Sequence, residues 1–148
     1  MLHRSLATPV GITRSAATTL LLALLLAGCT VEPQPATCPS GTPMRMYELY
    51  FGRSVPGNKE VTDRDWSGFI DQIITANLPN GYTVLDATGA WMNPKTQRTI
   101  REATKMLQAA LPDTPDSLAA IARIRSAYQT QFQQQLVGMT THTVCASF

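Results

Sequence analysis

The sequence is sparse in charged residues, in histidine and in long apolar runs. Charged residues make up 15% of its 148 positions. Beyond residue 28 the acidic and basic side chains balance, because the first 28 residues hold Arg4 and Arg14 but no Asp or Glu. A neutral, weakly charged domain argues against nucleic acid or an acidic surface as its partner. No run beyond residue 28 approaches the roughly 20 apolar residues that span a bilayer, so we expect no transmembrane segment there.

The sequence also lacks the patterns of common catalytic and cofactor sites. It contains no nucleophile elbow, no phosphate-binding glycine loop and no dinucleotide fingerprint. His142 is the one histidine beyond residue 28, and no His/Cys cluster has the spacing of metal ligands. His142 and Cys145 are three residues apart, so in a regular strand they point to opposite faces and cannot act as a nucleophile pair. We therefore expect neither a metal site nor a cofactor.

Residues 1–28 have the features of an export signal. A basic front is followed by the apolar stretch Ala16–Leu26, and two small residues precede Cys29. This arrangement resembles the lipobox of bacterial lipoproteins, in which the cysteine becomes the lipidated first residue of the mature protein. Lipidation of Cys29 would anchor an exported protein to a bacterial membrane, on its periplasmic or outer-membrane side. The alternatives are an ordinary signal cleaved nearby, with Cys29 an incidental thiol, and an uncleaved N-terminal anchor.

The rest of the chain divides into a short tether and one domain. Residues 29–43 contain four prolines and almost no side chain suited to burial, which predicts an extended spacer between lipid and domain. Residues 44–148 are enough for a single α+β domain with one core.

Hydrophobic periodicity in residues 44–148 predicts four strands and two helices. The first helix should begin at Thr62 and end near Leu78, and the second should begin at Thr114, with a proline at its first helical position. The segment 98–110 is compatible with a helix, but the short link before it favours a strand. The order βαββαβ is that of the ferredoxin-like sandwich, in which two helices cover one face of a four-stranded antiparallel sheet. Strands are expected at 44–53, 82–91, 98–110 and 137–148.

Cys38 and Cys145 remain as a pair once Cys29 is lipidated. Exported domains commonly join such pairs in disulfides. The first and last strands of the predicted sheet are antiparallel neighbours, so Cys38, ahead of the first, should lie near Cys145, close to the end of the last. We expect a Cys38–Cys145 disulfide; the alternative is two independent buried thiols.

Several segments of the domain are recognisable as a set. They are Glu48–Arg53, Trp66-x-x-Phe69, Leu78–Asp86, Gly89-Ala90-Trp91, Arg101-Glu102-x-x-Lys105, and Tyr128-x-x-x-Phe132 ahead of Cys145-x-x-Phe148. Together they resemble a family of small bacterial exported proteins known only as a domain of unknown function. That family usually has Gln where Ala90 stands and Asp where Asn80 stands. The resemblance implies an envelope location and a compact α+β domain, and it implies no activity.

The remaining candidate residues are polar groups on the sheet face away from the helices. Glu48 and Tyr50 share one side of the first strand, and Asp86 and Glu102 are expected on the same face of the next two. A carboxylate beside another carboxylate has a raised pKa and is suited to acid or base chemistry. Glu48, Tyr50 and Glu102 are therefore candidate catalytic residues. In the alternative, these groups are solvated, paired with Arg53 or other neighbours, or covered by a partner.

Two functions fit these observations. The preferred one is a lipid-anchored cell-envelope protein that binds a ligand, an envelope partner or a second copy through the open sheet face, where Met46 and Tyr50 would otherwise be exposed. The other is a small cofactor-free enzyme, similar to oxygenases or isomerases, which rests on fold analogy alone. The enzyme requires Glu48 and Glu102 to face one enclosed pocket. Ion pairs with Arg53 and Arg101 would argue against it.

Overall fold

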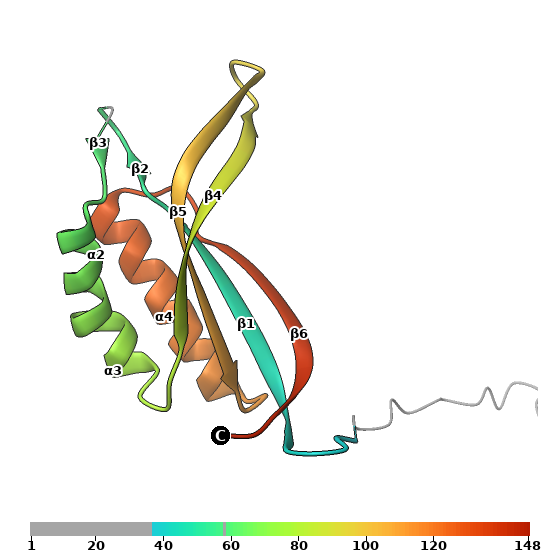
Figure 1. The fold of residues 1–148 in the computed structure, drawn as a ribbon. Helices are drawn as coiled ribbons and strands as arrows, with labels where there is room; N and C mark the ends of the chain where they lie inside the picture. Colours follow the sequence, from blue (N-terminus) through green and yellow to red (C-terminus); the bar gives the residue numbers. More distant parts are fainter. Residues whose placement is uncertain (1–36, 58) are drawn as a thin grey trace, which may run out of the picture. The chain divides into compact units, whose positions relative to one another are not determined.

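The structure is a computed structural model that describes residues 37–57 and 59–148. The predicted signal peptide, the lipidated Cys29 and the tether up to residue 36 lie outside the described residues. The described part is an α+β sandwich in which helices cover one face of a four-stranded antiparallel sheet (Figure 1).

The main sheet has the strand order β4-β5-β1-β6, with all neighbouring strands antiparallel. Its strands are β1 (Thr42–Gly52), β4 (Thr83–Asn93), β5 (Arg98–Leu111) and β6 (Gly138–Ala146). The first helix is α2 (Asp63–Phe69), continued by the π-helical turn η2 (Ile70–Ile74) and by α3 (Thr75–Asn77); the second is α4 (Pro115–Phe132). This is the strand order of the ferredoxin-like fold, so the predicted fold class is confirmed.

The ambiguous segment 98–110 is a strand, as favoured from the sequence. β5 pairs with β1 on one side and with β4 on the other, and β4 and β5 stay in one register from Asn93↔Arg98 to Thr83↔Gln108. A central strand satisfies its backbone groups on both sides, which outweighs the helical propensity of its Ala, Lys and Met residues. One element was not predicted. The short strands β2 (Ser54–Val55) and β3 (Lys59–Glu60) form a hairpin between β1 and α2.

Both helix starts agree with the sequence. Thr62 caps α2, and the side chain of Asp65 reaches back to the Thr62 backbone N–H to complete a capping box. Thr114 caps α4 by accepting from the Ser117 N–H, and Pro115 occupies the first turn. These caps satisfy N–H groups that would otherwise lack partners at the helix ends.

The core lies between the helices and the sheet and contains an aromatic cluster. β1 contributes alternate residues to it, with Leu49 and Phe51 fully buried. The Phe51 ring packs edge-on against Tyr128 of α4, with the two centroids 4.8 Å apart. The Tyr128 hydroxyl donates to the Gly52 carbonyl at 3.0 Å, and burial raises the pKa of this phenol. Each such buried side chain contributes about 1.5–3 kcal/mol. The cluster consists of Phe51, Trp66, Phe69, Tyr128 and Phe132.

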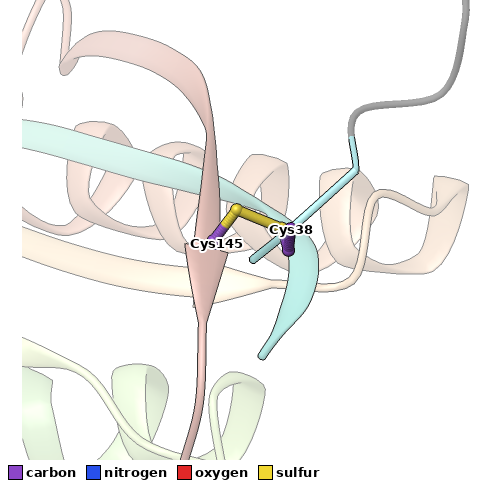
Figure 2. The surroundings of a disulfide bond; sticks show 2 residues. All are labelled: Cys38 and Cys145. Atoms are coloured by element: carbon purple, nitrogen blue, oxygen red, sulfur yellow. A yellow bond between two sulfur atoms is a disulfide. The ribbon is translucent and has the colours of Figure 1, made fainter. Parts of the chain in front are cut away.

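Cys38 and Cys145 form a disulfide (Figure 2). The β1–β6 register places Pro43 opposite Cys145, and the Cα atoms of the two cysteines are 5.5 Å apart. This is the pairing favoured from the sequence, and it suits a protein exported from the cytoplasm. Among the described residues, no helix combines the length and the apolar character needed to cross a membrane.

Candidate functional site: the open face of the sheet

The open face is the side of the main sheet that points away from the helices. β1 buries Tyr47, Leu49 and Phe51 against the helices, so the alternating Glu48 and Tyr50 lie on the open face. Residues that are paired across antiparallel strands point to the same side. The register therefore adds Leu85, Gly89 and Trp91 of β4, Glu102, Thr104, Met106 and Gln108 of β5, and Thr140 and His142 of β6.

Glu48 lies at the centre of a polar row across three strands. Its Oε1 accepts from Gln108 Nε2 at 2.9 Å, and its Oε2 accepts from Thr140 Oγ1 at 2.8 Å and from the Tyr50 hydroxyl at 3.3 Å. All three donors are uncharged. The hydrogen bond from Thr140, followed by that from Gln108, lowers the pKa of Glu48. This is the opposite of the raised pKa that an acid or base at this position was expected to have.

Glu102 lies in a second polar cluster, near the β4–β5 turn. Its Oε1 accepts from Trp91 Nε1 at 3.2 Å, and its Oε2 accepts from the Ser54 backbone N–H at 3.2 Å. The carboxylate occupies the space above Gly52, where a Cβ atom would lie 2.8 Å from either carboxylate oxygen. Glycine at this position therefore permits the close approach of Glu102 to β1.

The prediction that Asp86 lies on the open face is wrong. Asp86 is paired with Lys105 in the β4–β5 register, on the helix side of the sheet, and its Oδ1 lies 2.5 Å from Lys105 Nζ. Lys105 Nζ also lies 3.6 Å from Asp63 at the start of α2. Val84 packs against the core, so it shows which side of β4 faces the helices. Asp86 is two residues further on and therefore lies on the same side.

The predicted counter-ions do not reach the open face either. Arg53 binds Glu60 through Nε and Asp63 through Nη1, each at 3.1 Å, on the helix side. Arg101 lies opposite Ala90, also on the helix side of the register. Across residues 37–57 and 59–148, no Lys or Arg nitrogen lies within 4.0 Å of the carboxylates of Glu48 or Glu102.

The two candidate carboxylates do not meet in one pocket. Glu48 is opposite Gln108, which lies six residues from Glu102 along β5, a separation of about 20 Å. Two cavities of the described part lie elsewhere. One, of about 350 Å³, lies between the β2–β3 hairpin and the end of α4; the other, of about 280 Å³, lies between the end of α3 and the start of α4. Neither is lined by Glu48, Tyr50 or Glu102. Because the two carboxylates are about 20 Å apart, they do not face one pocket, which is the geometry that the enzyme hypothesis required.

Sequence reasoning identified the two carboxylates but not their partners. Trp91 and Ser54, which donate to Glu102, come from different strands, and only the strand register brings them together. A signal for Trp91 was present, because the segments that suggested the family resemblance include Gly52, Gly89-x-Trp91 and Glu102. These segments, far apart in the sequence, meet in one cluster on the open face.

Comparison with known proteins supports the family resemblance. A family described as "Protein of unknown function (DUF3574)" matches residues 46–148. A search of curated protein sequences gives no match. Among solved structures, a phage SAM lyase in complex with S-methyl-5'-thioadenosine is similar at a TM-score of 0.53 and 11% identity, covering 76% of this chain and 96% of that one. The apo state of a phage SAM lyase is similar at a TM-score of 0.51 and 12% identity, and the match covers 77% of this chain and 98% of that one.

The likeness to the phage enzyme concerns the fold alone, because so few residues are identical. The family match, in contrast, spans nearly all of the described domain and includes both carboxylate clusters of the open face. The chain therefore belongs to the DUF3574 family of proteins of unknown function.

Proposed function

We propose that this protein is a lipid-anchored component of the bacterial cell envelope whose domain binds a partner through the open face of its sheet. The proposal rests on the arrangement of charged and apolar side chains on that face. Two carboxylates, Glu48 and Glu102, accept hydrogen bonds from uncharged donors only. Between them lies an apolar band that includes Leu85 and Met106.

Two observations support the proposed location in the cell envelope. The lipobox-like segment before Cys29 predicts export and lipidation, and the disulfide between Cys38 and Cys145 suits an oxidising compartment. An extended proline-rich tether would hold the domain clear of the membrane surface.

The proposed surface is supported by exposure and charge. Leu85 and Trp91 keep 40% and 45% of their surface exposed, and large exposed apolar groups on one face indicate an interaction site. Between Glu48 and Glu102 the described face carries no Lys or Arg, and Arg98 lies at its β4–β5 end, so a second copy packed across the centre of the face would bring carboxylates toward carboxylates. The charge pattern therefore favours a partner that carries positive charge over a homodimer.

Site-specific photo-crosslinking in the native envelope tests the proposal. A benzophenone amino acid at position 85 samples the open face. The same group at position 118 is a matched control, because Leu118 is 52% exposed and belongs to α4, on the other side of the sheet. We expect a discrete adduct from position 85 and none from position 118. An adduct of twice the mass of the protein would indicate a homodimer. No adduct from position 85, or the same adduct from both positions, would contradict the open-face proposal.

A further inference from the structure

We propose that Glu102 and Trp91 form a binding site for an organic cation, meaning an alkylated ammonium or a guanidinium group. The inference rests on the proposed function, because it names the chemistry that the open face recognises. It also applies to a free small molecule or to a side chain of a partner, since both can present the same group.

The Glu102 carboxylate is held in place and still has acceptor capacity. Trp91 Nε1 and the Ser54 N–H each occupy one of its oxygens, and the absent side chain of Gly52 gives it room. A carboxylate offers about four lone-pair directions, so two donors leave roughly half of them free. A carboxylate that is already oriented loses little rotamer freedom when it binds a ligand.

Three of the four cations nearest to Glu102 are directed away from it, and the fourth, Arg98, shares its face but lies four residues along β5, about 14 Å away. Arg53 and Lys105 are close to it along the strands, yet both point to the helix side, where their side chains are only 13% and 12% exposed. There they contact Glu60, Asp63 and Asp86. Neither can reach Glu102 without breaking these contacts, so the negative charge remains available to an external cation.

Trp91 supplies the second half of the site. Its indole N–H is engaged by Glu102, while 45% of the residue stays exposed. The group left to interact is the aromatic ring, whose face attracts cations, and tryptophan does so most strongly among the aromatic residues. On the same face of β4, Gly89 adds no side chain of its own beside the ring, and the Thr104 hydroxyl of β5 lies over it.

The donor set separates an organic cation from a metal ion. Hard divalent cations require six or more oxygen ligands, or several waters with more than one carboxylate. In the part of the chain that the structure describes, no three His, Cys, Asp or Glu residues are grouped so that they can hold a metal. One carboxylate beside one exposed aromatic ring instead supplies a negative charge and a π face, both of which attract an alkylated ammonium.

The Trp91 indole N–H provides a direct readout by NMR. The mature protein, labelled with ¹⁵N at tryptophan and purified in a nonionic detergent, should give two indole signals, and Trp66, which is 4% exposed, is the internal control. The probe is choline chloride, and its neutral isostere 3,3-dimethylbutan-1-ol is the matched control. We expect choline to shift the Trp91 signal saturably without moving that of Trp66, and we expect no saturable shift with the isostere.

Two variants test which group carries the binding. Glu102→Gln should weaken choline binding about tenfold or more, because it removes a charge-assisted interaction. Asp71→Asn, which removes an exposed carboxylate from η2 on the helix side, is the matched control and should change binding less than about twofold. Calorimetry on Trp91→Leu, which needs no Trp91 signal, should show a several-fold loss. An equal shift with the isostere, undiminished binding by Glu102→Gln, or no saturation with choline would overturn the inference. If these fail while position 85 still crosslinks, the cation site is wrong and the proposed function stands.

Discussion

Trp91 and Glu102 lie diagonally across the β4–β5 hairpin, and the Trp91 indole N–H donates to Glu102 Oε1 at 3.2 Å. The other carboxylate oxygen accepts from Ser54 in β2, so one side chain connects three strands. Strand alternation places Lys105 of β5 on the opposite side of the sheet, where Arg53, just after β1, also lies. The open face therefore combines an oriented carboxylate with an exposed aromatic ring, which is the basis of both proposals.

Replacing Gly52 tests the packing of Glu102. Gly52→Ala adds a Cβ atom 2.8 Å from the carboxylate oxygens, so the Glu102 side chain must move away and lose its two donors. We expect a loss of about 1 kcal/mol in the free energy of unfolding and a large shift of the Trp91 indole signal. Gly68→Ala is the control, because no atom lies within 4 Å of the added Cβ in helix α2, and it should stabilise the protein by about 0.5–1 kcal/mol. An unchanged Trp91 signal in Gly52→Ala would contradict the described contact.

Glu48 should make the stability of the protein dependent on pH in the acidic range. Its pKa in the folded state is lowered from 4.5 by hydrogen bonds from Thr140, Gln108 and Tyr50. A depressed folded-state pKa gives stability that is present above the unfolded-state pKa and is lost as pH falls through the folded-state pKa. Urea unfolding from pH 7 to pH 3 should therefore show a difference between wild type and Glu48→Gln that shrinks below about pH 4.5. A difference that stays constant or grows on acidification would rule out this account of Glu48.

The Cys38–Cys145 disulfide should contribute strongly to stability. The two cysteines are 107 positions apart, and a loop of that length gives at most about 4–5 kcal/mol in the chain-entropy model. Urea unfolding of the double variant Cys38→Ala/Cys145→Ala should reveal this loss, and a reductant should destabilise only the wild type. Two alkylatable thiols at positions 38 and 145 in the native oxidised protein would refute the pairing.

Cys29 should determine whether the protein stays with the membrane. Cys29→Ser removes the thiol that carries the acyl chains in the proposal, so the variant should move from the membrane fraction to the soluble fraction. Fractionation of cells that express either form measures this directly, and Cys38→Ser is the control because it leaves the proposed lipidation site intact. Continued retention of Cys29→Ser in the membrane fraction would argue for an uncleaved anchor.

The fold was predictable because its local signals agree. The caps at Thr62 and Thr114 mark both helix starts, and the alternation through Tyr47, Leu49 and Phe51 marks the buried side of β1. The strand order then follows from the βαββαβ pattern, and it brings the ends of the first and last strands together as the Cys38–Cys145 pairing requires.

The site was predictable only in part, because cross-strand partners depend on register. Periodicity alone placed Glu48 and Tyr50 correctly, since β1 alternates cleanly. Periodicity failed for β4, because exposed residues line both of its faces. Within this strand, Val84 is the one residue that clearly shows which side faces the core. The register also decides that Glu48 meets Gln108 and that Glu102 meets Trp91 about 20 Å away, and no local pattern contains that information.

The most direct test of the binding face compares two adjacent residues. Trp91 and Met92 are 45% and 60% exposed and lie on opposite sides of β4. Hydroxyl-radical footprinting of the purified protein should oxidise both. In the native envelope we expect oxidation of Trp91 to fall several-fold while that of Met92 is unchanged, because the partner covers the open face. Equal oxidation of Trp91 in both preparations, or protection of Met92 alone, would contradict the proposal.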